Sequence, residues 1–148
     1  MIIRKANAGD VPALVELYHS HLTHYPPKEA PDLDLWGAIV ERFESSDSMY
    51  LLVAEEDGAA VSTVQMAIIE NLTHGVSPFA VIENVVTHPD YRQRGFASAL
   101  LERATEIARE HHCYKLFLET GSNRESTLNF YRRNGFEIDA KHSCLKRL

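Results

Sequence analysis

"HPDYRQRGFASALLERA", residues 88–104, places charged and small residues at the start of an amphipathic helix. Pro89 ends the preceding strand, and the apolar residues after Gly95 recur at helical spacing. A helix N-terminus exposes unpaired N–H groups and the positive end of the helix dipole, which together attract anions. Gly95 and Ala97 leave room for a ligand to approach the backbone. The stretch therefore predicts an anion-binding loop, and a solvated helix start is the alternative.

Composition and charge exclude several other classes of protein. The 148 residues are 45% hydrophobic and 24% charged, so we expect one globular domain over residues 1–148. No apolar run approaches the roughly 20 residues of a membrane span, and the start lacks a signal-peptide core, which predicts a cytoplasmic protein with no membrane partner. The net charge of −6 argues against nucleic acid as a partner. The P-loop ending G-K-[ST] and the Rossmann pattern G-x-G-x-x-G are both absent.

Hydrophobic periodicity predicts a mixed sheet with helices on both faces, an α+β fold. Asp57-Gly58 joins two of the strands as a hairpin. The predicted order is β-α-α-β-β-β-α-β-α-β-β, which gives six to seven strands. The strands are expected over 2–5, 50–55, 60–69, 79–87, 115–119, 136–138 and 143–146, and the helices over 11–22, 33–44, 96–108 and 126–134.

Two segments together resemble the GCN5-related N-acetyltransferase (GNAT) superfamily. The first, VIENVVTHPDYRQRGFASALLERA, contains Arg92-Gln93-Arg94-Gly95-Phe96-Ala97, which matches the family's acetyl-CoA motif [Q/R]-x-x-G-x-[G/A]. The second, LFLETGSNRESTLNFYRRNGF, contains a loop asparagine and then a helix that ends in the family's Y-x-x-x-G-F, residues 131–136. The element order also matches. The resemblance implies a mostly antiparallel sheet and acetyl-CoA as cosubstrate.

The resemblance also implies which residues bind the cofactor. The strand end at Val85, Val86 and Thr87 would splay from its neighbour and bond the pantetheine arm. The pyrophosphate would lie on backbone amides from Gln93 to Ser98, a span that includes Phe96, with Arg92 and Arg94 at the rim. Asn123 would contact the arm or the adenosine end; because this loop is one residue longer than the usual family spacing, Ser126 is the other candidate.

Tyr131 is the family's usual general acid, and it would protonate the departing thiolate. A phenol with a reference pKa of about 10 is mostly protonated at neutral pH, so it can donate. The alternative is a core aromatic residue, because Phe130 and Phe136 are close in sequence. A backbone N–H of Val85 or Val86 would polarise the carbonyl.

Glu83 is the candidate base, acting directly or through water as related enzymes do. On a regular strand it faces the same side as Val85, and Asn84 faces the other. A carboxylate inside the apolar run FAVIENVV is costly without a purpose or partner. The alternatives are a structural ion pair or a solvent-facing edge residue.

The acceptor site is indicated only weakly. Tyr25, Glu29 and Trp36 lie where the family shapes this site. The formal charge is −8 over residues 1–75 and +2 over residues 76–148, which favours a cationic amine. The eight histidines lack metal-ligand spacing, so surface histidines and no metal are expected.

The sequence thus predicts an acetyl-CoA-dependent N-acetyltransferase that transfers an acetyl group to a primary amine of a small molecule or peptide by direct attack in a ternary complex. A homodimer is left open. One alternative is a non-catalytic acyl-CoA-binding or sensing domain. Another is a nucleotide- or phosphosugar-binding module that uses the same helix start, although it gives residues 131–136 no role.

Overall fold

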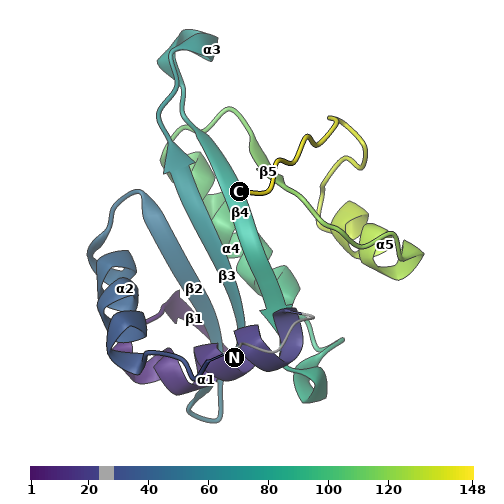
Figure 1. Cartoon of the computed structure of the whole chain (residues 1–148). Coiled ribbons are helices and arrows are strands. Elements are labelled where there is room, and N and C mark those ends of the chain that lie inside the picture. The colour runs from purple at the N-terminus through teal and green to yellow at the C-terminus, as the bar shows by residue number, and fades with distance from the viewer. Residues whose placement is uncertain (24–28) are drawn as a thin grey trace.

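A five-stranded sheet is the centre of the fold (Figure 1). The computed structural model describes residues 1–23 and 29–148. The strand order is β1-β2-β3-β4-β5; the first four strands are antiparallel, and β5 runs parallel to β4. The strands are β1 (Ile2–Lys5), β2 (Met49–Glu56), β3 (Ala59–Ile69), β4 (Phe79–Thr87) and β5 (Leu116–Leu118).

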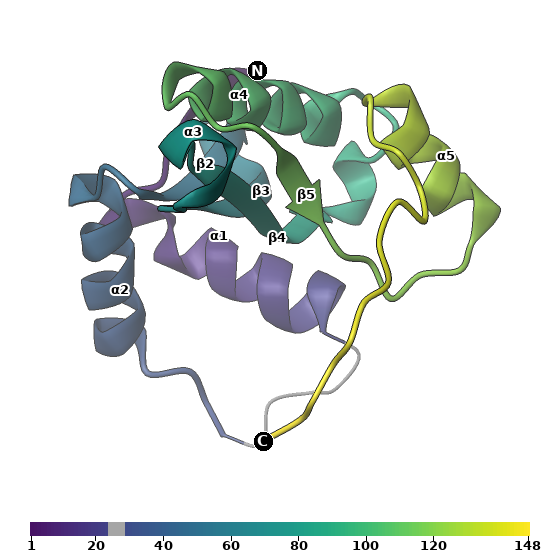
Figure 2. The same ribbon diagram turned by 90° about the horizontal axis from the view of Figure 1, so that it is seen from above.

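Helices cover both faces of the sheet, as Figure 2 shows from above. On one face, α1 (Val11–Glu16) continues into η2 (Leu17–Leu22) beside α2 (Leu33–Ser45); on the other lies α4 (Phe96–Glu110), with α5 (Glu125–Arg133) at the β5 end of the sheet. The short helices are η1 (Ala8–Asp10), α3 (Thr73–Val76) and η3 (Pro89–Tyr91). The predicted α+β class with a mixed, mostly antiparallel sheet is confirmed. No helix in the described part of the chain is long and apolar enough to cross a membrane.

Strand alternation divides the apolar residues between two cores. In β2, Leu52 and Ala54 pack in the core under α4, whereas Leu51 and Val53 pack in the core under α1 and α2. The hairpin between β2 and β3 forms at Asp57-Gly58, where both residues have positive φ (52° and 81°) as a type I′ turn requires.

The predicted strands over 136–138 and 143–146 are absent. The sheet therefore has five strands, whereas the sequence predicted six to seven. Residues 139–148 are exposed, and the Leu145 side chain retains 74% of its accessible surface. The sequence KHSCLKRL offers too few apolar side chains to cover one face of a strand, so pairing it with the sheet would bury little apolar surface.

A β-bulge interrupts β4 next to the predicted cofactor site. Gln65 of β3 pairs with Glu83 and Thr63 pairs with Val86, so two residues of β4 stand opposite one residue of β3. Asn84 supplies the extra residue and has a left-handed backbone (φ 56°), a region that asparagine enters more readily than most residues. The strand therefore shifts its alternation at Asn84.

The bulge overturns the prediction that Glu83 and Val85 share a face. Residues that pair across antiparallel strands lie on the same face, so Glu83 shares its face with Val86. Val85 instead packs toward the α4 core, which contains Val64. A period of two assumes a regular strand, and the inserted residue breaks it.

The first long helix changes its winding part-way along. Residues 11–16 are α-helical, but η2 is a π-helix, in which each N–H bonds to the carbonyl five residues earlier. Thr23 N–H donates to Tyr18 C=O (3.0 Å) and so ends the π-helix. Residues five apart therefore lie nearer to one side of this segment than they would in an α-helix, where about 140° separates them.

Candidate active site

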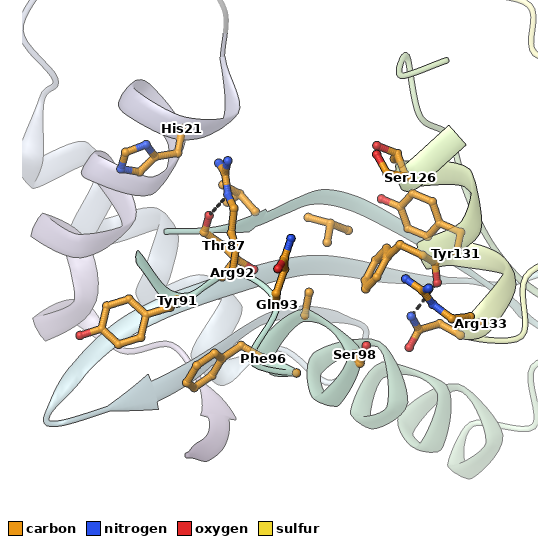
Figure 3. Close-up of a pocket in the computed structure, with 17 residues that line it drawn as sticks. His21, Thr87, Tyr91, Arg92, Gln93, Phe96, Ser98, Ser126, Tyr131 and Arg133 are labelled. Atoms are coloured by element: carbon orange, nitrogen blue, oxygen red, sulfur yellow. Dashed lines mark hydrogen bonds between the residues drawn. The ribbon is translucent and has the colours of Figure 1, made fainter. Parts of the chain in front are cut away.

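A cavity of about 890 Å³ opens between the end of β4, the first turn of α4 and α5 (Figure 3). It lies where β4 and β5 separate: the two strands pair only as far as Ile82 and Leu118, so β4 has no partner on that side from Glu83 onward. The resemblance implied this splay, and it leaves backbone groups of β4 available to a ligand. The predicted cofactor residues in the lining are Val85, Val86, Thr87, Arg92, Gln93, Gly95, Phe96, Ala97, Ser98 and Ser126.

The floor of this cavity is the uncapped start of α4. Gly95 is the N-cap residue with a left-handed backbone (φ 86°), and no side chain caps the helix. The first backbone bond is donated by Ala99 N–H to Gly95 C=O (2.9 Å), so the N–H groups of Phe96, Ala97 and Ser98 have no partner among the described residues. Free N–H groups and the helix dipole are the features that bind anions at other helix starts, so the predicted anion site has the backbone geometry that it needs.

The two arginines of the loop behave differently. Arg92 lines the cavity, and its Nε donates to Thr87 C=O (3.2 Å; Figure 3). Arg94 is outside the lining: it pairs with Glu56 (3.2 Å), and its guanidinium stacks over Tyr91 (4.9 Å to the ring centroid). Arg94 therefore holds the loop to β2, and Arg92 supplies the charge on the cavity side.

A second cavity, of about 730 Å³, adjoins the first. Four residues line both: His21, Val85, Thr127 and Tyr131. The remaining lining comes from η2, β4 and the segment after β5, and it includes Glu83, Glu119 and Arg124, with Asn123. Asn123 and Ser126 thus line different cavities, so the two candidates are not equivalent.

Tyr131 stands at the junction of the two cavities. Its side chain is largely buried (8% exposed) against Phe130 and Phe136, with ring centroids at 5.1 and 5.9 Å. Burial raises the pKa of its phenol above the usual value, which keeps the hydroxyl protonated at neutral pH. The hydroxyl makes no hydrogen bond to any described residue. Tyr131 is thus a core aromatic residue that also lines both cavities, and its role as the general acid stays a prediction.

Glu83 is exposed and lines the second cavity only. No described residue forms an ion pair or hydrogen bond with its carboxylate, so the structural ion pair is not found there. The carboxylate faces the same side of the sheet as η2, where it is accessible to an incoming amine.

Two of the three predicted acceptor residues line neither cavity. Tyr25 lies outside the described residues. Glu29 is exposed and lines neither cavity, and Trp36 packs on Tyr18 (5.9 Å) and His19 (5.4 Å) in the core under α2. His21, which the sequence suggested was a surface histidine, lies in the cavity wall because η2 crosses the end of β4.

Comparison with known proteins agrees with this geometry. The family model described as "Acetyltransferase (GNAT) family" matches residues 12–136. The chain belongs to this family. The predicted resemblance is therefore confirmed, and the protein is an N-acetyltransferase.

Relatives and solved structures of the family match most of this GNAT chain. Glucosamine 6-phosphate N-acetyltransferase of Trypanosoma brucei brucei is 29% identical over 143 residues, 97% of this chain and 93% of that protein. Streptothricin acetyltransferase A of Bacillus subtilis (strain 168) is 30% identical over 125 residues, 75% of this chain and 70% of that protein. The solved structure of AAC(6')-Iy in complex with the bisubstrate analog CoA-S-monomethyl-acetylneamine shares the fold, with a TM-score of 0.77, 21% identity and coverage of 99% of this chain and 97% of that one.

Proposed function

We propose that this GNAT protein transfers the acetyl group of acetyl-CoA directly to a primary amine of a small molecule or peptide while both substrates are bound. The observation that supports this most is the junction of the two cavities at Val85 and Tyr131. One cavity has free N–H groups for a pyrophosphate, and the other has a carboxylate for an amine. The thioester carbon would lie where they meet.

Each step of the transfer has a candidate group. Glu83 accepts a proton from the ammonium or from the attacking amine, directly or through one water molecule. The amine then forms a bond to the thioester carbon, and the N–H of Val85 or Val86 stabilises the negative charge on the oxygen. The C–S bond breaks, and Tyr131 gives its proton to the CoA sulfur. The products are an N-acetyl amine and CoA.

The acceptor side of the proposal rests on the second cavity. Glu83 and Glu119 contribute two carboxylates and Arg124 one guanidinium, which favours a cationic amine. By their names, two relatives act on glucosamine 6-phosphate and streptothricin. A cytoplasmic location and a homodimer remain predictions.

The competing function is a non-catalytic acyl-CoA-binding domain. Release of free CoA thiol from acetyl-CoA with a panel of polyamines, amino sugars, amino acids and peptide N-termini separates the two. We expect at least one amine to be acetylated, and Glu83→Gln to lower kcat/KM for it about 10²-fold while acetyl-CoA affinity is unchanged. Glu70→Gln, an exposed glutamate outside both cavities, is the matched control. Tight acetyl-CoA binding without thiol release for any amine would favour the sensing domain.

A further inference from the structure

Three side chains with metal-ligating atoms converge beside the first cavity. One ligand atom from each of Glu16, His21 and His88 lies within 4.8 Å of the other two. Glu16 ends α1, His21 is in η2, and His88 follows β4, so the cluster joins the long N-terminal helix to the strand that carries the proposed cofactor site. The His88 Nε2 is 3.5 Å from the Glu16 carboxylate, and the His21 and His88 rings meet edge to face at 4.8 Å.

The π-helix explains why Glu16 and His21 can act together. They are five residues apart, and the i to i+5 bonding of η2, which begins directly after Glu16, brings residues at this spacing nearer to one side than an α-helix does. In an α-helix, with 3.6 residues per turn, they would point in directions about 140° apart. π-Helical turns are rare and frequently occur at functional sites. Here the turn aligns two ligands that sequence spacing would separate.

One ring nitrogen of His21 has no partner among the described residues. The His21 Nε2 is buried and makes no hydrogen bond within the described residues. A buried polar atom without a partner loses its bonds to water and gains nothing in exchange, so each such case in a folded protein calls for an explanation. An ion pair between His88 and Glu16 satisfies those two residues and leaves His21 unexplained.

We propose that Glu16, His21 and His88 form a binding site for a divalent transition metal of the zinc type. Two imidazoles and one carboxylate are a ligand set that Zn²⁺ accepts, with water in the fourth position. Donor atoms around a tetrahedral zinc ion at about 2.1 Å lie about 3.4 Å apart, so the widest spacing, up to 4.8 Å, must shorten by up to about 1.4 Å. The Glu16–His88 contact is already 3.5 Å, so the shortening falls on the distances to His21, and the Glu16 side chain, which is 59% exposed, is free to follow.

Asp90 supplies the outer partner that a metal-bound histidine usually has. In the structure the His88 Nδ1 accepts a hydrogen bond from Asp90 N–H (3.3 Å), and the Asp90 carboxylate is 3.9 Å from the same nitrogen. Coordination through Nε2 places the ring proton on Nδ1, which then gives up the bond from Asp90 N–H and donates instead toward the Asp90 carboxylate. Carboxylates in this position fix the orientation and tautomer of the ligating ring.

The test measures Zn²⁺ binding to the whole chain by isothermal titration calorimetry. The exposed Cys144 is replaced by serine in every sample, so that its thiol does not bind the metal. We expect one Zn²⁺ per chain, and affinity at least about tenfold weaker in Glu16→Gln, His21→Gln and His88→Asn. Asparagine at position 88 can still cap Asp90 N–H but has no donor atom in place of Nε2.

The control is His142→Asn, which alters an exposed histidine far along the chain from the cluster. It should leave Zn²⁺ affinity unchanged. Co²⁺ serves as a second probe, because a tetrahedral site gives visible absorption bands, and His88→Asn should lose them. The proposal is wrong if the parent protein binds Zn²⁺ no more tightly than the three variants, or if His142→Asn weakens binding as much as they do. These measurements need no acetyltransferase activity, so they stand apart from the proposed function.

Discussion

Replacing Gly95 by alanine tests the anion-binding loop with the smallest possible change. Gly95 has φ 86°, and a Cβ built there meets no atom of the described protein within 4 Å. The cost to the free protein is therefore conformational only. A left-handed backbone costs a residue with a Cβ about 1–2 kcal/mol, and the lower entropy of the unfolded chain offsets about 0.4–1 kcal/mol of this. We expect a net loss of about 1 kcal/mol, which lowers the Tm by about 3 °C.

A fall in acetyl-CoA affinity beyond this small loss of stability must come from contact between the new methyl group and the ligand. If the pyrophosphate lies against Gly95, the added methyl group occupies its place, and we expect acetyl-CoA affinity to fall at least about tenfold, or about 1.4 kcal/mol. Gly58→Ala is the matched control, because Gly58 also has a left-handed backbone (φ 81°) in open space but lies in the β2–β3 hairpin. Thermal melts give the loss of Tm in each variant, and acetyl-CoA titrations show whether Gly95→Ala alone loses affinity. Equal losses of Tm with acetyl-CoA affinity retained in Gly95→Ala would refute the cradle.

Three further changes test other parts of the molecule. Tyr131→Phe should lower kcat about 10²-fold with acetyl-CoA affinity unchanged, because it removes only the proton donor; an unchanged kcat would exclude the acid role. Asp10→Asn should lower the free energy of unfolding at pH 7 by roughly 2–3 kcal/mol in urea titrations, since Arg4 binds this buried carboxylate through two hydrogen bonds (2.7 and 2.8 Å). Burial opposes ionisation of Asp10, but the Arg4 and Asn7 hydrogen bonds lower its pKa, so this contribution should be present above about pH 4 and lost as the pH falls further. Burial raises the pKa of Tyr18 to about 12, so stability should fall by about 2 kcal/mol as the pH rises from 10 to 12, and Tyr18→Phe should flatten that slope.

The elements that sequence predicts well are those with long, regular apolar patterns. The stripe along residues 96–108 and the alternation of β2 and β3 each bury one continuous face, and the structure contains them at nearly the expected bounds. The predicted strands over 136–138 and 143–146 had short patterns with few apolar side chains, and they are absent. A pattern of three or four residues does not show whether burial compensates the cost of ordering the chain.

The site residues also divide into those that a local sequence pattern predicts and those that depend on contacts between distant segments. The anion loop was predictable because its working groups are consecutive in the chain and belong to one helix start. The relation between Glu83 and Val85 was wrong because a bulge adds one residue, and nothing in FAVIENVV except Asn84 hints at it. His21 was missed because its place in the cavity wall depends on η2 crossing β4, a contact between segments more than 60 residues apart. Sequence spacing reports neighbours along the chain and says little about such crossings.

The bulge at Asn84 gives the enzyme two independently adjustable surfaces on one strand. Side chains at position 83 reach the second cavity alone, whereas position 86 lines only the first cavity and position 85 lines both. Because Glu83 is also the proposed base, a mutational library that explores amine selectivity should keep Glu83 and vary its neighbours in the second cavity, such as Glu119 and Arg124, while the surface of the first cavity stays intact. Asn84 itself is the residue to leave untouched in such a library, because its left-handed backbone (φ 56°) disfavours β-branched replacements. For protein engineering, one inserted residue allows the two cavities to be changed separately through different positions of the same strand.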